Sequence, residues 1–318
     1  MKKILLLLLI CFAQNLFAQE VFTYDDFRYT INKNNEITIT KYNGYSSSVD
    51  IPSVIDGKIV TTIGDGAFDS CESLTSITIP DSVTTIGGEA FYDCASLTSI
   101  IIPNSVIAIG EGAFSCCLSL TSITIPDSVT TIGDYAFSYC KSLTNIEISE
   151  NNETFTVIDN ILYNKKEKMF HTCFSKKTNV VIPNGILKIN NGAFFGCSSV
   201  TSIIIPNSVT TIGDSSFSDC SSLTSITIPN SVTTIGIYAF QSCTSLTSIT
   251  IPKSVTTIGK KAFYDCDSLT SITIPDSVTT IGDYAFSDCN SLIIQCNSGS
   301  YAKEYCEYFR IKYLVTPD

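Results

Sequence analysis

The segment Leu74–Ser96 reads LTSITIPDSVTTIGGEAFYDCAS, and the next 23 residues repeat it almost letter for letter. Cysteines follow the same spacing at positions 71, 94, 117 and 140, and again at 197, 220, 243, 266 and 289. One step is irregular, because the interval from 140 to 197 is 57 residues, 34 more than one repeat. A fixed period between 20 and 50 residues is typical of stacked repeat proteins.

The first part of each unit predicts a half-buried β-strand. In LTSITIP, Leu74, Ile77 and Ile79 are apolar, whereas Thr75, Ser76 and Thr78 are polar. β-Branched residues in this alternation favour a pleated strand with one side buried. The proline that follows has no backbone N–H to donate to a neighbouring strand, and it therefore ends the strand.

The rest of the unit predicts the return of the chain to the next turn. Val83 and Ile86 form a second short extended piece, and Gly87 allows a tight backbone after it. We call the segment 87–95 and its copies the return arc. Phenylalanine and cysteine recur there at positions that we expect to point inward as a core ladder. The ladder comprises Phe91, Cys94, Phe114, Cys117, Phe137, Cys140, Phe217, Cys220, Phe240, Cys243, Phe263 and Cys266.

A single turn cannot bury its apolar side alone, so copies must stack, with strands about 4.8 Å apart. The pattern therefore predicts a curved, mainly β repeat solenoid. The motif L-x-x-I-x-I-P-x-x-V-x-x-I-G-x-x-A-F-x-x-C resembles the BspA-type leucine-rich repeat of bacterial surface proteins, over residues 49–291. That resemblance implies a right-handed leucine-rich-repeat coil with capped ends.

The flanks also resemble that family. Residues 19–48 are expected to form an N-terminal cap, with a two-strand hairpin over Phe27–Tyr42. Residues 292–318 are expected to form a C-terminal cap with a helix and a strand between Gly299 and Tyr313. Caps are needed because the end turns would otherwise expose the core and unpaired strand edges.

Residues 1–18 have the pattern of a secretory signal peptide. Two lysines precede an apolar run that is too short to cross a bilayer, and the segment closes on Ala18. Cleavage there would remove two lysines and one cysteine, which leaves a net charge of −13 and 13 cysteines. We therefore expect an exported protein without a membrane span, located outside the cell, at its surface or in the periplasm.

The irregular unit, residues 143–176, departs from the repeat. Its middle alternates apolar and polar residues on both sides of a charged stretch, which predicts a β-hairpin with its turn near Asn164–Lys168. One interpretation is a lengthened repeat. The other is a recognition element, because the unit carries the densest basic cluster: Lys165, Lys166 and Lys168, with Lys176 and Lys177 close by.

The cysteines invite a disulfide interpretation because the chain is expected to be exported. Nine of them occupy one equivalent inward position, however, and parallel side chains give poor disulfide geometry. We expect these nine to be small buried hydrophobic residues. A bridge between Cys296 and Cys306 in the C-terminal cap remains open. No C-x-x-C pair exists, so a zinc site is not expected.

Neither catalysis nor nucleic-acid binding is expected. His171 is the single histidine, no G-x-S-x-G motif precedes a helix, and the recurrent turn aspartate is replaced by Lys253 in one copy. No cofactor or metal is therefore expected. The formal net charge of −11 argues against binding to phosphates.

The outward positions 2, 3 and 5 of the first strand form a surface that we call the strand face. In a leucine-rich-repeat arc this face is expected to be concave and to be a candidate binding surface. Its residues are Thr75, Ser76, Thr78, Thr121, Ser122, Thr124, Thr224, Ser225, Thr227, Thr247, Ser248, Thr250, Thr270, Ser271 and Thr273. Copies differ most after the repeat glycine, so these turns, the caps or the irregular unit are better candidates for specific recognition.

The expected function is non-catalytic. Resemblance to the BspA-type family implies an adhesin-like solenoid that binds host, matrix or cell-surface proteins. The alternative is a structural or protective surface protein with no dedicated ligand. The oligomeric state is left open, and fold alone does not decide between the two functions.

Overall fold

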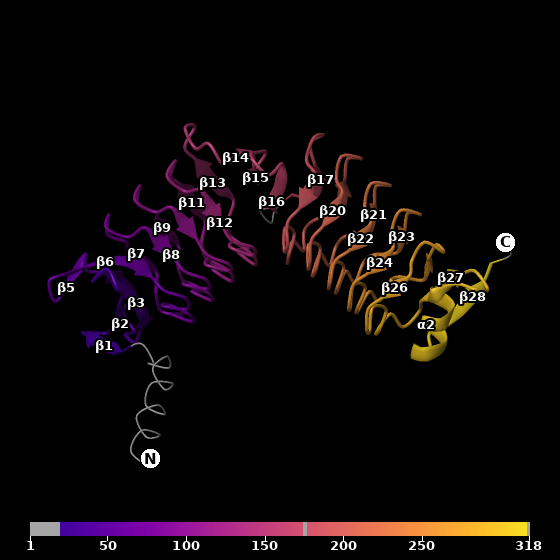
Figure 1. Ribbon diagram of the computed structural model, residues 1–318, viewed down its shortest axis with the longest axis horizontal. Helices are drawn as coiled ribbons and strands as arrows, with labels where there is room; N and C mark the ends of the chain where they lie inside the picture. The colour runs from indigo at the N-terminus through magenta and orange to yellow at the C-terminus, as the bar shows by residue number, and fades with distance from the viewer. Residues whose placement is uncertain (1–19, 174–176, 317–318) are drawn as a thin grey trace, which may run out of the picture.

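The computed structural model describes residues 20–173 and 177–316 (Figure 1). The signal peptide expected at residues 1–18 lies outside this part of the chain. The molecule is an arch with two arms, and the irregular unit lies at its top. The fold is the predicted mainly β leucine-rich-repeat solenoid.

The N-terminal cap is a three-stranded meander rather than a two-stranded hairpin. Its strands are β1 (Val21–Tyr24), β2 (Phe27–Ile31) and β3 (Ile37–Tyr42). The pairs β1–β2 and β2–β3 are antiparallel, whereas β3 runs parallel to the first strand of the stack beyond it. The sequence predicts the β2–β3 hairpin correctly and misses β1, whose side chains are mostly exposed and carry little apolar pattern.

The first arm contains two columns of parallel strands. The first column is β4 (Ser48–Asp50), β7 (Ser76–Thr78), β9 (Ser99–Ile101), β11 (Ser122–Ile125) and β13 (Asn145–Ile148). The second column is β6 (Lys58–Ile63), β8 (Thr85–Ile86), β10 (Ala108–Ile109) and β12 (Thr131–Ile132), with β5 (Val54–Ile55) paired to β6.

The irregular unit is a three-stranded antiparallel sheet. Its strands are β14 (Phe155–Ile158), β15 (Ile161–Asn164) and β16 (Met169–Cys173). The antiparallel pairing of β15 with β16 confirms the predicted hairpin and its turn. β16 then pairs in parallel with the second column of the other arm, so the unit is built into the stack.

The second arm repeats the two columns. The first column is β17 (Asn179–Val181), β19 (Ser202–Ile204), β21 (Ser225–Thr227), β23 (Ser248–Thr250), β25 (Ser271–Thr273) and β27 (Ile293–Cys296). The second is β18 (Lys188–Ile189), β20 (Thr211–Ile212), β22 (Thr234–Ile235), β24 (Thr257–Ile258) and β26 (Thr280–Ile281).

The C-terminal cap contains the predicted helix and strand, α2 (Tyr301–Phe309) and β28 (Tyr313–Val315). The Ser300 side chain caps the helix N-terminus by accepting a hydrogen bond from the Lys303 amide, and Arg310 ends the helix in a left-handed conformation. β28 pairs in parallel with β27. The cap therefore covers the last turn of the stack.

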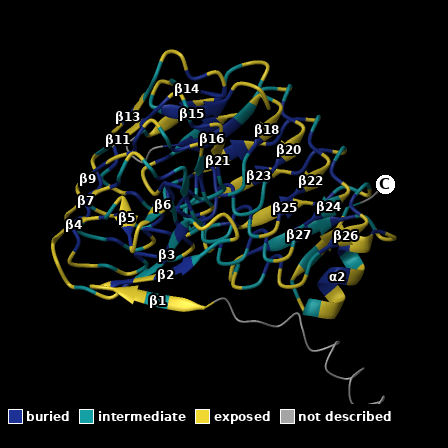
Figure 2. Ribbon diagram, turned by 60° about the vertical axis from the view of Figure 1, so that its left-hand side comes forward, coloured by how far each residue is buried: buried dark blue, intermediate teal, exposed yellow. Residues whose placement is uncertain are grey.

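The core is one ladder in each arm, as the burial colours indicate (Figure 2). Phe217 stacks between Phe194 and Phe240 with ring centroids 5.2 and 5.0 Å away. The first arm has the same arrangement, with 5.4 Å between Phe91 and Phe114. The repeat glycines allow close approach of the backbones, because a Cβ on Gly110 would lie 2.4 Å from the Gly87 carbonyl carbon.

Candidate functional site

The return arcs, and not the strand face, line the inside of the arch. In Figure 1, β7, β9 and β11 lie towards the outer edge of one arm, and β21 and β23 lie towards the outer edge of the other. The return arcs lie on the inner side of both arms. The expectation of a concave strand face is therefore wrong. The irregular unit lies between the two arms at the top of the arch.

Direct contacts between the arms hold the inner side closed. The Asn191 side chain donates a 2.8 Å hydrogen bond to Asp134, and the Tyr139 hydroxyl donates a 2.8 Å bond to Asp219. The Tyr139 ring also lies edge-on to Phe195, with 4.9 Å between centroids. Burial, and then the bond to Asp219, raise the pKa of Tyr139, so the hydroxyl keeps its proton.

Each return arc displays side chains through two residues with positive φ. In the second arc these are Glu89 (φ 53°) and Asp93 (φ 54°). The left-handed conformation turns the chain sharply and is costly for any residue other than glycine. The equivalent pairs are Gly66 and Ser70, Gly112 and Cys116, Tyr135 and Tyr139, Gly192 and Gly196, Ser215 and Asp219, Tyr238 and Ser242, Lys261 and Asp265, and Tyr284 and Asp288.

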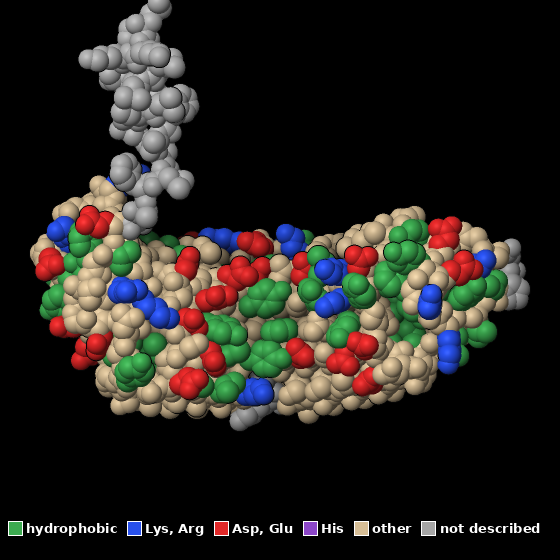
Figure 3. Space-filling view, turned by 90° about the horizontal axis from the view of Figure 1, so that it is seen from below, with side chains coloured by type: hydrophobic (Ala, Val, Ile, Leu, Met, Phe, Trp, Pro, Cys, Tyr) green, Lys and Arg blue, Asp and Glu red, His purple; other side chains and the backbone are tan. Residues whose placement is uncertain are grey.

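The inner face is acidic. Its nine return arcs carry thirteen carboxylates and three lysines, whereas the strand face carries two carboxylates, Asp50 and Glu147. Figure 3 looks into the arch from below and shows carboxylates and apolar side chains distributed along this face. The carboxylates are Asp65, Asp69, Glu72, Glu89, Asp93, Glu111, Asp134, Asp214, Asp219, Asp265, Asp267, Asp283 and Asp288.

Tyrosines lie among these carboxylates. Tyr92 and Tyr284 are exposed, and Tyr238 is half-buried. The Lys261 ammonium already lies 4.9 Å from the Tyr264 ring centroid and 5.7 Å from that of Tyr238. An aromatic ring and a carboxylate that lie side by side can both attract one cation, the ring through a cation–π interaction and the carboxylate through its negative charge. The inner face is therefore suited to cationic groups.

The fifteen residues predicted for the strand face are polar and uncharged. Fourteen of them are exposed, and Ser122 is half-buried. The hydroxyl at position 2 of several units is already used within the protein, because it donates to the carbonyl of the equivalent residue one turn earlier. Thr247, for example, donates to the Thr224 carbonyl at 3.2 Å, and Thr224 donates to that of Thr201 at 3.3 Å. These bonds support strand stacking and leave fewer free donors for a ligand.

All twelve residues of the phenylalanine–cysteine ladder are buried. The cysteine thiols have a role that sequence reasoning missed, since each donates to the carbonyl of a phenylalanine 26 residues earlier. The Cys220 thiol lies 3.2 Å from the Phe194 carbonyl oxygen, and that of Cys243 lies 3.1 Å from the Phe217 oxygen. Burial raises the pKa of Cys117 to about 12 and that of Cys220 well above its usual value.

Cys296 and Cys306 of the C-terminal cap are free thiols. Both of these are buried. The bridge left open from the sequence is therefore absent from this structure. Cys71 and Cys289, at the ends of the ladder, and the off-ladder Cys116 are only half-buried.

The lysines of the irregular unit lie on the turn between β15 and β16. Lys165, Lys166 and Lys168 are all exposed, and the Lys165 ammonium donates to the Asn152 carbonyl. Lys177 pairs with Asp159 at 3.6 Å, while Lys176 lies outside the described residues. The three turn lysines thus form a small basic patch on an otherwise acidic protein.

His171 has a structural position. It is buried, its Nε2 lies 3.0 Å from the Ile132 carbonyl oxygen, and its ring lies edge-on to Phe155. Burial lowers its pKa, so the ring is neutral near pH 7. Within residues 20–173 and 177–316, no three His, Cys, Asp or Glu side chains are grouped as a metal site would require.

The comparisons with known proteins agree with this architecture. The sequence profile of the BspA type leucine-rich repeat region matches six copies over residues 61–165 and 164–293. The chain belongs to the BspA-type leucine-rich repeat family. Proteins of this family and fold are typically non-catalytic, and the family suggests an interaction or surface role. No curated protein matches the chain.

Three solved structures illustrate the similarity. A leucine-rich cell surface protein from Faecalibacterium prausnitzii is 29% identical, with a TM-score of 0.60, and the match covers 91% of this chain and 97% of that one. A leucine-rich repeat protein from Bacteroides ovatus is 27% identical over 86% and 84% of the two chains, with a TM-score of 0.51. The pneumococcal vaccine antigen PcpA shares the fold at 19% identity, covering 94% and 99%, with a TM-score of 0.63.

The α-helical content of the described residues is the nine-residue helix α2. No helix in this part of the chain has the length and apolar character required to cross a bilayer.

Proposed function

We propose that this family member is an exported, non-catalytic adhesin-like protein that binds a protein partner through the inner face of its arch. The observation that carries the proposal is the difference between the two long surfaces. The strand face is mostly threonine and serine with two carboxylates, Asp50 and Glu147, whereas the inner face varies from turn to turn and carries thirteen carboxylates among its tyrosines. Variation on a regular scaffold is what selective recognition requires.

The partner that fits this face is cationic. Lysine and arginine side chains of a host, matrix or cell-surface protein would meet carboxylates and aromatic rings at successive turns. Each contact at an exposed site contributes little. Several contacts made at once by a rigid array add up through multivalency. Carboxylates also steer a cationic partner to the face over a distance set by the salt concentration.

Export rests on the segment at residues 1–18 and on the description of the Faecalibacterium relative as a cell surface protein. The alternative function, a structural or protective surface protein with no dedicated ligand, is favoured by the strand face. Its position-2 threonine hydroxyls, such as those of Thr224 and Thr247, are engaged in stacking rather than free for a ligand. The two functions differ in whether binding is saturable.

The test measures binding of residues 19–318 to immobilised poly-L-lysine, poly-L-glutamate and purified basic matrix proteins by surface plasmon resonance. We expect saturable binding to the cationic ligands alone. Raising the salt concentration from about 0.1 M to about 1 M shortens the Debye length from about 10 Å to about 3 Å and should abolish this binding.

Two matched variants locate the surface. The double variant Glu89→Gln/Glu111→Gln removes two carboxylates from the inner face and should weaken binding several-fold. The control Asp81→Asn/Asp127→Asn removes two exposed carboxylates from the turn after the first strand, where other copies already have asparagine. Equal weakening by both variants would show that net charge alone attracts the ligand. Absence of saturable binding to every cationic ligand would favour the structural alternative.

A further inference from the structure

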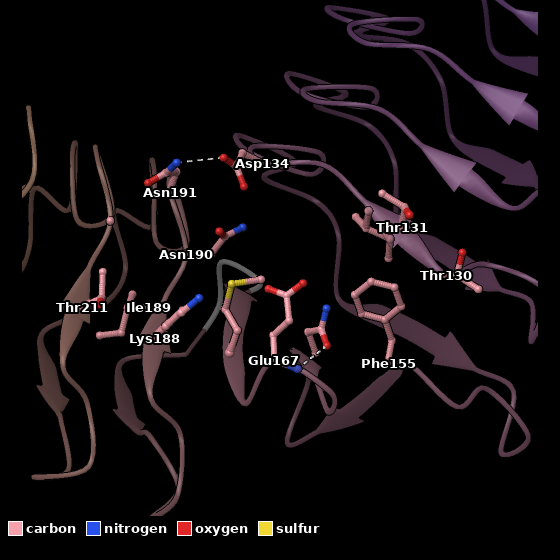
Figure 4. A pocket seen from close by; sticks show the side chains of 14 residues that line it. Thr130, Thr131, Asp134, Phe155, Glu167, Lys188, Ile189, Asn190, Asn191 and Thr211 are labelled. Atoms are coloured by element: carbon pink, nitrogen blue, oxygen red, sulfur yellow. Dashed lines mark hydrogen bonds between the residues drawn. The ribbon is translucent and has the colours of Figure 1, made fainter.

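A polar pocket lies where the two arms meet (Figure 4). It has a volume of about 390 Å³ and is lined from three sources. The first arm contributes Thr130 and Asp134, the irregular unit contributes Asn164 and Glu167, and the second arm contributes Lys188 and Asn190. No regular turn of the solenoid brings together three such segments.

The repeat sequence changes at the residues that line this pocket. Position 188 is lysine, whereas the next copies have Thr211 and Thr234. Position 190 is asparagine, whereas the next copies have Gly213 and Gly236. The repeat pattern is therefore broken at two residues of the second arm that line the pocket.

Asn190 shows why the pocket exists. A Cβ on Gly213 would lie 2.6 Å from the Asn191 backbone nitrogen, so a side chain cannot be accommodated in the regular stack. The turn before Asn190 is the irregular unit, and there the carboxamide fits. Its Nδ2 is out of contact with solvent and has no hydrogen-bond partner among the described residues. An unpaired buried amide is costly, and this one belongs to a residue that lines the pocket.

The other polar groups leave capacity for a ligand. Asp134 accepts a hydrogen bond from Asn191 through one carboxylate oxygen. The Glu167 side chain is exposed, and its backbone amide donates to Asn164 at 3.0 Å. Figure 4 shows Glu167 on one side of the pocket and Lys188 and Asn190, from a single segment of the second arm, on the other. Met169 and Ile132 add apolar surface to the lining.

From this lining we infer that the pocket binds a small neutral saccharide. Its volume lies at the lower end of the range for small-molecule pockets, about 300–1,000 Å³. Two carboxylates beside one lysine disfavour an anion. Carboxylates, carboxamides, an ammonium and hydroxyls together offer both acceptors and donors, which hydroxyl groups of a sugar match because each can donate and accept. The apolar side chains suit the C–H faces of a sugar ring.

The experiment follows the side-chain amide resonances of 15N-labelled residues 19–318 during titration with cellobiose, maltose, lactose and N,N′-diacetylchitobiose. We expect at least one of these sugars to shift the Asn190 side-chain resonance, and the Asn191 resonance beside it, saturably. Methylammonium chloride is the comparison for a ligand that is only cationic, and it should leave both resonances unchanged.

Asn190→Gly is the decisive variant, because it restores the residue of the other copies and should not impair folding. We expect it to raise the Kd for the sugar about tenfold, as does loss of a hydrogen bond to a charged or buried group. Asn230→Asp, which also restores the residue of other copies and lies outside the lining, should leave the Kd unchanged. No saturable shift with any sugar, an unchanged Kd in Asn190→Gly, or a response to methylammonium alone would overturn the inference.

Discussion

A regular turn and the junction of the two arms use similar residues in different ways. In the regular stack, Phe217 has a phenylalanine on each side and the environment of one copy is the environment of all. At the junction, Phe155 meets His171 edge-on, and His171 contacts the Ile132 carbonyl 39 residues away. One repeat sequence therefore determines the packing of every regular turn, whereas the packing at the junction depends on individual residues that occur once.

This difference has a functional consequence. Stacking produces a long, rigid scaffold with a constant spacing, on which the inner face varies. The junction sets the angle between the arms through contacts such as that of Tyr139 with Asp219. It also brings three segments together around the pocket beside Asn190. Scaffold and specificity are therefore located in different parts of the chain.

The largest expected effect concerns the stack. Replacement of Phe217 by alanine should lower the free energy of unfolding by about 3–5 kcal/mol, because a fully buried ring is lost between two neighbours. Urea unfolding followed by circular dichroism measures it. The matched variant at the junction, Phe195→Ala, removes a half-buried ring and should cost about 1 kcal/mol. Equal costs for the two variants would contradict the distinction between stack and junction.

The next effect concerns the cysteine ladder. Cys220→Ala should cost about 1–2 kcal/mol, since it removes a buried thiol and one of the two hydrogen bonds that the Phe194 carbonyl accepts, the other coming from the Cys197 amide. Cys220→Ser should recover part of this cost because a hydroxyl also donates. In the native protein a thiol reagent should modify only the half-buried Cys71, Cys116 and Cys289, and the remainder only after unfolding. Four or more disulfides would contradict this view of the ladder.

The third prediction uses the pH dependence at the junction. The folded protein holds His171 neutral with a lowered pKa, whereas the unfolded chain takes up a proton near pH 6.5. Its contribution to stability is therefore complete above pH 6.5 and is lost as pH falls towards the folded pKa, by up to about 1.4 kcal/mol per pH unit. Urea unfolding at pH 7.5 and pH 5.5 measures the loss. His171→Gln should remove this part of the pH dependence, and an unchanged dependence would assign it to other groups.

The sequence contains much of the fold because the fold is repetitive. The apolar positions of Leu74–Ser96 predict the strand and the inward ladder, and the hairpin at β15–β16 follows from alternation. The direction of curvature was not predictable, because the irregular unit that lies between the arms departs from the repeat. The contact of Tyr139 with Asp219, which are 80 residues apart, and the pocket beside Asn190 require the three-dimensional junction. The 23-residue repeat carries no information about these contacts.

The smallest expected effect compares one repeat position in two settings. Ser215 and Tyr135 occupy the same left-handed position of the return arc, where three other copies have glycine. A left-handed conformation costs an L-residue about 1–2 kcal/mol, and glycine in turn loses about 0.5–1 kcal/mol more chain entropy on folding. Ser215→Gly in the regular stack should therefore stabilise the protein by about 0.5 kcal/mol in urea unfolding.

At the junction the same replacement should have the opposite sign. Tyr135 packs edge-on against Phe195, with 5.8 Å between ring centroids, and its hydroxyl donates to the Asp214 carbonyl at 3.2 Å. Tyr135→Gly relieves the same backbone strain but loses both contacts, so the net result should be destabilisation by about 1 kcal/mol. If both variants stabilised the protein, the tyrosine contacts would contribute less than the strain, and the angle between the arms would have to depend on other residues.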